Sequence, residues 1–246
     1  MSSRAPSYPV LLGGLTVLSI LLFAASLLIG PAAIGFWDSL AALIAGDGAA
    51  ATLVMREIRL PRAILGFMIG ATLGLSGAVL QGLLRNPLAD PGLLGISASA
   101  SLGAVIAIYT GLSAAFALAL PLSALLGAVL AVLAVQALAG AHGGNLTLIL
   151  AGVAVSSLAA ALTSCALNLS PNPFAALDLV FWMLGSLRDR AMTRVVLGAT
   201  IMPLGWAMLA GLGRSLDALA LGEDAAARIG VNLRGVRLVA VFGTAS

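Results

Sequence analysis

The sequence predicts an all-α, polytopic transmembrane helical bundle, and three observations support this fold class. Of the 246 residues, 61% are hydrophobic and only 9% are charged, whereas a soluble domain normally carries roughly 25% charged residues. Uncharged runs of about twenty residues recur along the chain, which is the length that crosses a bilayer as a helix. Clusters of glycine and proline separate these runs. Lipid is therefore the expected solvent for most of the surface.

The first part of the chain contains two of the expected spans. Residues 10–29 form the first, which Gly30 and Pro31 end; without a small-residue cleavage signal, we favour a transmembrane helix over a cleaved signal peptide. Trp37 suits a membrane interface, and residues 36–44 fit a short helix lying at the surface. The second span is expected over residues 63–84.

The middle of the chain carries no Asp, Glu, Lys or Arg from residue 91 to residue 177. That length fits three helices with short loops, and a sixth span follows them. The third to sixth spans are expected over residues 93–110, 115–139, 146–169 and 195–213. A last apolar run over 238–246 is too short to span, so the chain is expected to stop inside a seventh helix.

Two local patterns stand out around the second span. Gly66, Gly70 and Gly74 recur every four residues and predict a smooth helix face that another helix can approach closely. After Arg85 come two prolines four residues apart, with Asn, Asp and Gly around them, and these cannot continue a helix. The sequence therefore predicts a sharp turn over residues 86–92.

Three sequence words around this span carry a family resemblance. They are RLPR from Arg59, GATLGLSGAVLQ from Gly70 and RNPLADPGLLGIS from Arg85. In this order they resemble the membrane permease subunits of bacterial ABC importers for iron-siderophores, haem and cobalamin, the FecCD-type permeases. The WMLGS word that begins at Trp182 is similar to a family word after the fifth helix. The resemblance implies a type II ABC importer permease fold, with residues 1–246 as one transmembrane domain.

The resemblance also implies where the chain lies and how it is oriented. Six arginines fall on each side of the predicted topology, so the positive-inside rule gives a tie. Family permeases lie in the inner membrane with a cytoplasmic N-terminus, which makes the polar segment 214–237 cytoplasmic. Since family members continue through about three more helices, the chain is expected to be truncated at its C-terminus.

The polar segment from Leu219 to Gly230, LALGEDAAARIG, predicts a short helix over residues 222–229. Its carboxylates lie at the positive end of the helix, and Asp224 and Arg228 form a favourable pair. From the residues alone, a solvated loop helix is as good an interpretation as a functional one. The resemblance implies a coupling helix that contacts an ATPase subunit through Leu221, Gly222, Glu223, Ala226, Arg228 and Gly230.

Arginines cluster before the second span at Arg56, Arg59 and Arg62. They are consistent with anchoring to lipid phosphates. The resemblance instead implies docking of a periplasmic substrate-binding protein, whose carboxylates a planar guanidinium pairs with bidentately. Later candidates for the same docking surface are Arg188, Arg190 and Arg194.

The resemblance further implies a cytoplasmic gate and a substrate path. The gate residues are Asn86, Leu88, Asn145 and Leu146, and Asn86 can at the same time be a helix-capping or turn asparagine. Small or weakly polar residues on the third and fifth spans are path candidates, and each alone is more often a packing residue. They are Ser97, Ser99, Ser101, Ser156 and Ser157, with Thr163 and Ser164. The family usually has glycine at the positions of Ser99 and Ser101.

No enzyme site is recognisable in the sequence. His142 is the only histidine and has no acidic or cysteine neighbour, so a metal site is not expected. Cys165 fits a packed small residue. The absence of a GxxxxGK[ST] run excludes ATP binding by this loop type, so no cofactor is expected on this chain and ATP with Mg belongs to a partner ATPase. The sequence has no basic platform with aromatic residues, so nucleic acid binding is not expected.

These observations predict the permease of an ATP-driven importer for an iron(III)-siderophore, or for haem or cobalamin, working by alternating access. Its expected partners are a second permease copy or a paralogue, two cytoplasmic ATPase subunits, a periplasmic binding protein and the lipid bilayer. The alternative is an ion-coupled secondary transporter or a passive channel. Such a carrier usually has an ionisable group at mid-membrane, and the charges here lie at the ends of the predicted spans.

Overall fold

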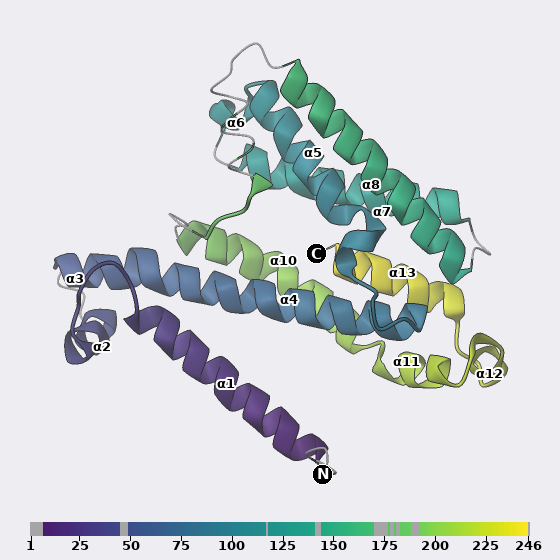
Figure 1. The fold of residues 1–246 in the computed structure, drawn as a ribbon, viewed down its shortest axis with the longest axis horizontal. Helices are drawn as coiled ribbons and strands as arrows, with labels where there is room; N and C mark the ends of the chain where they lie inside the picture. The colour runs from purple at the N-terminus through teal and green to yellow at the C-terminus, as the bar shows by residue number, and fades with distance from the viewer. Residues whose placement is uncertain are drawn as a thin grey trace, which may run out of the picture. The chain divides into compact units, whose positions relative to one another are not determined.

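A computed structural model describes residues 7–44, 49–116, 118–140, 144–169, 177, 180, 183–187 and 192–245. These residues are helical or lie in turns, and none of them forms a strand. The chain forms two compact units, Met1–Gly70 with Leu187–Ala199 and Ala71–Ser186 with Thr200–Ser246. Two of the three boundaries between the units fall within long helices, α4 (Leu60–Leu84) and α10 (Met192–Ala210), which Figure 1 labels.

The first unit opens with two helices that the sequence predicts. The helix α1 (Tyr8–Leu28) is the first predicted span, and none of its residues is buried. The helix α2 (Phe36–Ile44) has the predicted bounds of the surface helix. The side chains of Phe36 and Trp37 are exposed and meet edge to face, with ring centroids 5.1 Å apart. Exposed paired aromatics fit the interfacial position expected of this helix.

The second predicted span begins much earlier than residue 63. A continuous helical stretch starts at α3 (Ala50–Leu53), passes through the π-helical segment η1 (Val54–Arg59) and continues as α4. Proline within a helix removes a backbone donor and crowds the preceding turn. Just before Pro61 the backbone is π-helical: the Leu60 amide bonds the Met55 carbonyl five residues back instead of four. This wider turn makes room for the proline ring. The prediction failed because it counted only the uncharged run, which begins after Arg62.

The predicted turn after α4 is present, and hydrogen bonds fix the backbone at its start and at its end. Arg85 has φ +51°, which among the described residues is the only positive φ outside glycine. The Asn86 amide bonds the Gln81 carbonyl at 3.1 Å, the long hydrogen bond of a Schellman ending. The Asp90 carboxylate then accepts the Gly92 amide at 2.7 Å and starts the 3-10 turn η2 (Pro91–Leu94).

The third predicted span is shorter than expected. The helix α5 (Ile96–Tyr109) has 14 residues and begins after Gly95, whose φ is +72°. Residues 93–95, which the sequence assigns to the span, belong instead to the turn. A short helix α6 (Leu112–Ala115) leads to α7 (Ala119–Ala139), and α8 (Asn145–Asn168) follows.

In the second unit, α5 and α7 pack through a reciprocal pair of small residues. A Cβ on Gly103 would overlap the backbone oxygen of Ser123, and a Cβ on Gly127 would overlap that of Ser99. Each helix therefore presents a serine and a glycine four residues apart to the other, the spacing that lets membrane helices approach closely. Of the predicted stripe, a Cβ at Gly66 would contact the Leu187 side chain at 3.6 Å, while a Cβ at Gly70 or Gly74 would meet no atom within 4 Å among the described residues of this chain.

The last part of the chain contains α10 and three shorter helices. These are α11 (Gly213–Ala220), α12 (Glu223–Arg228) and α13 (Leu233–Thr244). The helix α12 confirms the predicted short helix, and α13 contains the start of the predicted seventh span. The helix α11 was not predicted; it buries Ala218 and Leu219 while its polar residues face outward. Within the second unit, the Trp206 indole donates to the Thr72 hydroxyl at 2.8 Å and ties α10 to α4.

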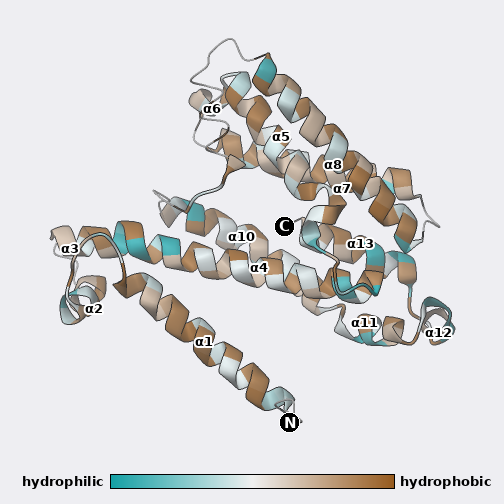
Figure 2. Cartoon of the chain, in the orientation of Figure 1, coloured by the Kyte–Doolittle hydropathy of each residue, from teal (hydrophilic) through white to brown (hydrophobic). Residues whose placement is uncertain are grey.

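The predicted fold class is confirmed. Six full spans were predicted, but the third corresponds to α5, which is shorter than the other candidate spans. In the described part, five helical stretches are long and apolar enough to cross a bilayer: Tyr8–Leu28, Ala50–Leu84, Ala119–Ala139, Asn145–Asn168 and Met192–Ala210. Apolar residues predominate along these helices, and polar residues gather near α12 and at the start of α4 (Figure 2). The prediction that Cys165 is packed is wrong, because its side chain is exposed in this chain.

Candidate coupling segment and gate

The segment between α11 and α13 depends on two glycines. Gly222 has φ +114° and ψ 153°, a region that is essentially restricted to glycine. Gly230 has φ +88°, and the amides of Val231 and Gly230 bond the carbonyls of Ala226 and Ala227 at 3.0 and 3.1 Å. These two bonds form a complete Schellman ending. The six-residue helix α12 is therefore fixed in direction at both ends by backbone geometry.

The predicted coupling residues lie on two different faces of this segment. Ala226 is fully buried against the core of the second unit. Leu221 is 75% exposed, and Arg228 and Gly230 are also exposed. Ile229, which the sequence analysis did not single out, is 66% exposed. The sequence signal for Ile229 is an isoleucine placed between Arg228 and the helix stop at Gly230.

The predicted gate asparagines both hold backbone groups. The Asn86 side-chain oxygen accepts the Leu88 amide at 2.9 Å, so Asn86 is a turn asparagine, as the sequence analysis allows. Asn145 is the first residue of α8, and its side-chain nitrogen donates to the Leu83 carbonyl in the last turn of α4 at 3.1 Å. Leu88 and Leu146 are 84% and 70% exposed. Each predicted gate turn thus pairs an anchored asparagine with an exposed leucine.

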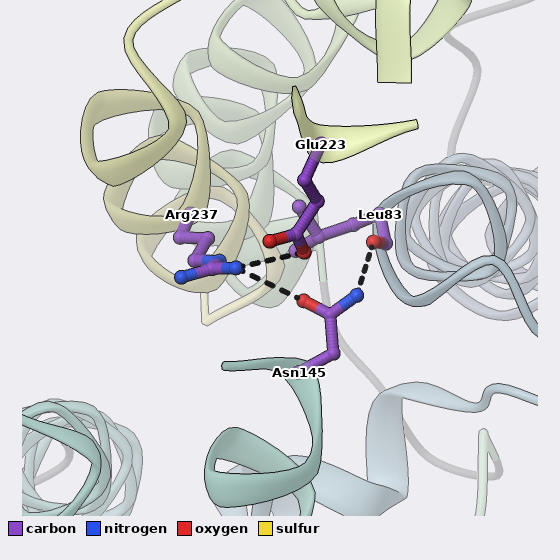
Figure 3. Close-up of polar contacts among 4 residues, drawn as sticks. All are labelled: Leu83, Asn145, Glu223 and Arg237. Atoms are coloured by element: carbon purple, nitrogen blue, oxygen red, sulfur yellow. Dashed lines mark hydrogen bonds and ion pairs between the residues drawn. The ribbon is translucent and has the colours of Figure 1, made fainter. Parts of the chain in front are cut away.

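Arg237 of α13 contacts both Glu223 of the predicted coupling segment and Asn145 of the predicted gate, as Figure 3 shows. Its Nη2 donates to the Glu223 carboxylate at 2.9 Å and to the Asn145 side-chain oxygen at 3.4 Å. The Arg237 and Glu223 side chains are 17% and 39% exposed, respectively. No sequence pattern singles out Arg237, because contact between residues 145, 223 and 237 depends on the packing of three helices.

A polar hollow of about 700 Å³ adjoins these residues in the second unit. It brings together residues that the sequence assigned to two separate functions. Its lining consists of Arg85, Asn145, Leu221, Gly222, Glu223, Asp224, Ala225 and Arg228.

The three predicted docking arginines differ in their surroundings within the first unit. Arg59 is only 4% exposed, and its guanidinium donates to the carbonyls of Leu27, Leu28 and Ala32. Arg56 is exposed, and its Nε donates to the Leu43 carbonyl at 3.1 Å. Arg62 is half-buried. The later candidates Arg188 and Arg190 lie outside the described residues, as does Trp182, whereas Arg194 lies in α10.

The predicted path serines also fall into two groups. Ser99 is buried at the α5–α7 contact, and Ser156 lies against the Gly95 turn. Ser97 and Ser157 are exposed, and Ser101 is half-buried. Packing therefore accounts for Ser99 and Ser156. Of the two further candidates, Thr163 is buried and Ser164 is exposed.

In the described part of the chain, no three His, Cys, Asp or Glu side chains are grouped closely enough to hold an ion. His142 lies outside the described residues.

Comparison with known proteins gives a consistent family assignment. The model of the FecCD transport family matches residues 17–245. The chain is 38% identical over 205 residues to an uncharacterised ABC transporter permease of Bacillus subtilis, covering 81% of this chain and 58% of that protein. It is 37% identical over 249 residues to the ferric enterobactin transport system permease of Escherichia coli, covering 98% of this chain and 72% of that one.

Two further matches extend the comparison. A cobalamin import system permease of Halobacterium salinarum is 36% identical over 185 residues, covering 74% of this chain and 49% of its own length. A solved structure of a metal-chelate-type ABC transporter in an inward-facing conformation matches with TM-score 0.82 and 29% identity, covering 97% of this chain and 74% of that chain. The chain spans 58% and 49% of the length of the Bacillus and Halobacterium relatives.

Proposed function

Because the chain belongs to the FecCD transport family, we propose that it is the membrane permease of an ATP-driven bacterial importer for a metal chelate. An iron(III)-siderophore is the first candidate substrate, ahead of haem and cobalamin. Relatives named for ferric enterobactin and cobalamin transport support this substrate class. The chain moves substrate from a periplasmic binding protein into the cytoplasm by alternating access and catalyses no covalent step. It lies in the inner membrane with its N-terminus in the cytoplasm and pairs with a second copy or a paralogue.

One observation carries the ATP-driven part of this proposal. Leu221 and Ile229 are 75% and 66% exposed at the two ends of α12, beside the charged residues Glu223, Asp224 and Arg228. Charged residues keep this segment out of the bilayer, so lipid does not cover these two side chains. Exposed apolar residues with a polar rim are typical of protein contacts. A cytoplasmic ATPase subunit is the partner that fits, with Ala226 anchoring the helix from inside.

Arg56 and Arg62 are the residues that dock the periplasmic binding protein, whereas Arg59 has a different role. Arg56 uses its Nε within the chain and retains its two terminal nitrogens, which suit an incoming carboxylate. Arg59 is buried on three carbonyls and acts as an internal support.

For the gate, the proposal rests on Leu88 and Leu146, two exposed leucines that follow anchored asparagines. Apolar constrictions can close a path by excluding water. Ser97, Ser101 and Ser157 remain the candidate lining of the path, because α5–α7 packing and the Gly95 turn account for Ser99 and Ser156.

The proposal is tested by co-purification of the ATPase subunit with the full-length permease. Arg228→Glu reverses an exposed charge on α12, and we expect it to lower the recovered ATPase at least about tenfold, equivalent to about 1.4 kcal/mol of binding free energy. Arg214→Glu reverses another exposed charge, on α11, and serves as the matched control. Equal recovery from both variants would count against α12 as the ATPase contact. Gly222 is unsuitable for this test because its φ alone would make a substitution disruptive.

Uptake of ⁵⁵Fe-labelled siderophore by cells separates the proposal from an ion-coupled carrier. We expect uptake to stop when the ATPase gene is deleted. Uptake that continues without the ATPase and stops when a protonophore collapses the ion gradient would favour the carrier.

A further inference from the structure

We propose that Arg237 is a positioning residue that transmits movement of α12 to the gate at the start of α8. This inference rests on the proposed function, since it needs α12 to be the element that the ATPase moves. It assigns a role to a residue outside the predicted coupling, docking, gate and path sets.

On the side of the coupling segment, α12 and α13 form a helical hairpin that is joined by its loop and by an ion pair. The Schellman ending at Gly230 joins α12 to the loop that leads into α13. The Asn232 side chain accepts the Gly235 amide at 3.0 Å and fixes the start of α13. The ion pair between Glu223 and Arg237 then joins the beginning of α12 to the second turn of α13 at 2.9 Å. Because both the loop and the ion pair join the helices, displacement of α12 also displaces the Arg237 guanidinium.

The gate side is equally well defined. Asn145 is the first residue of α8 and holds two partners at once, the Leu83 carbonyl through its nitrogen and Arg237 through its oxygen. The next residue, Leu146, is the exposed gate leucine. Asn145 and Leu146 are the first two residues of α8, so a pull on Asn145 that displaces the start of this helix also displaces Leu146.

The contacts of Arg237 with Glu223 and with Asn145 differ in length, so a movement of α12 should change the Asn145 contact first. The bond to Glu223 at 2.9 Å is of ordinary length, whereas the bond to Asn145 at 3.4 Å is longer than the usual 2.7–3.2 Å. Both contacts use the same nitrogen atom. A small displacement of α12 toward α8 tightens the Asn145 bond and a small displacement away breaks it, while Glu223 keeps its hold. The polar hollow beside Glu223 leaves room for that displacement.

The experiment uses the full-length permease assembled with its ATPase in membrane vesicles. Leu146→Cys, in a background without other cysteines, reports the gate through its rate of labelling by a maleimide. We expect the labelling rate to differ at least about fivefold between the nucleotide-free complex and the complex trapped with ATP and vanadate, as for a modest allosteric coupling. ATPase co-purification is measured on the same preparations.

Arg237→Met keeps the length of the side chain and removes its donors. We expect it to reduce the nucleotide-dependent difference below about twofold while ATPase recovery is unchanged. The matched control is Arg234→Met, an exposed arginine one turn earlier on α13, which should retain the full difference. A purely structural role of Arg237 would lower the amount of assembled complex but leave the response of the remaining complex intact, and that result would overturn the inference.

Two further outcomes complete the test. If Arg237→Met does not assemble, Asn145→Ala replaces it: loss of the nucleotide response supports the connection, and a retained response overturns it. If the reporter protein without either substitution shows no nucleotide response, or recovers no ATPase, the proposed function itself fails and the inference fails with it. A response that survives Arg237→Met overturns the inference alone.

Discussion

The helices α1 and α5 are both apolar, yet they are attached to their neighbours in opposite ways. The helix α1 has no buried residue, and within the first unit its C-terminal carbonyls are bound by the buried guanidinium of Arg59. The helix α5 has five buried residues and meets α7 at points where only glycine fits. One contact is polar and lies at a helix end, while the other is apolar and runs along a helix face.

The difference follows from the solvent. In lipid, apolar side chains gain little by leaving the solvent, so a helix is attached by close backbone packing or by polar contacts. Small residues at Ser99, Gly103, Ser123 and Gly127 allow the first solution. The helix α1 lacks such a pairing, and Arg59 supplies the second: it caps the negative end of the helix, where a cation is favoured.

The largest effect is expected where backbones touch. Gly127→Ala places a Cβ on the Ser99 backbone oxygen, so α5 and α7 must separate, and we expect the free energy of unfolding to fall by about 3 kcal/mol. Unfolding in detergent with increasing sodium dodecyl sulfate measures this change. Gly77→Ala, where a Cβ meets nothing within 4 Å in the described chain, should leave stability unchanged or raise it slightly. Equal losses at both positions would show that helix packing is not the cause.

Removing the polar cap should have a smaller effect. Arg59→Met keeps the bulk of the side chain but leaves three carbonyls without this donor, and we expect a loss of about 2 kcal/mol, because hydrogen bonds to charged groups are stronger than neutral ones. Limited proteolysis between α1 and α2 would report the loosened helix end. Arg56→Met removes a single exposed bond and should cost less than about 0.5 kcal/mol.

The same cap can be disturbed from the opposite side. A Cβ on Gly30 would lie 2.9 Å from two nitrogens of the Arg59 guanidinium, so Gly30→Ala should shift that group and cost about 1 kcal/mol. The substitution should add little to Arg59→Met, since both remove the same interaction. Additive losses in the double variant would mean that Gly30 acts independently of Arg59. Gly13→Ala in the open part of α1 is the control.

A single hydrogen bond between helices should have the smallest effect. Thr72→Val removes the hydroxyl that accepts the Trp206 indole at 2.8 Å, and we expect a loss of about 0.6 kcal/mol, the typical value for such bonds between membrane helices. The tryptophan fluorescence spectrum of the variant monitors the indole. A loss above about 2 kcal/mol would place this bond on the same level as the Arg59 cap.

Several elements could be predicted because their signals are local. The bounds of α2 followed from a short amphipathic run between breakers, and α12 followed from acidic residues at its start and Gly230 at its end. The start of α4 and the start of α5 could not be predicted. A π-helical turn before Pro61 and a 3-10 turn after Asp90 are decided by a few hydrogen bonds that composition does not reveal.

The sequence by itself determined that lipid is the solvent, which segments are helical, and which family the chain resembles, because hydropathy, breakers and motif words are properties of neighbouring residues. Only the tertiary structure decided which glycines touch a backbone, that Arg59 is buried on carbonyls, and that Arg237 lies between Glu223 and Asn145. These contacts join residues separated by 14 to 92 positions. Their existence depends on how helices cross, and no local pattern encodes that geometry.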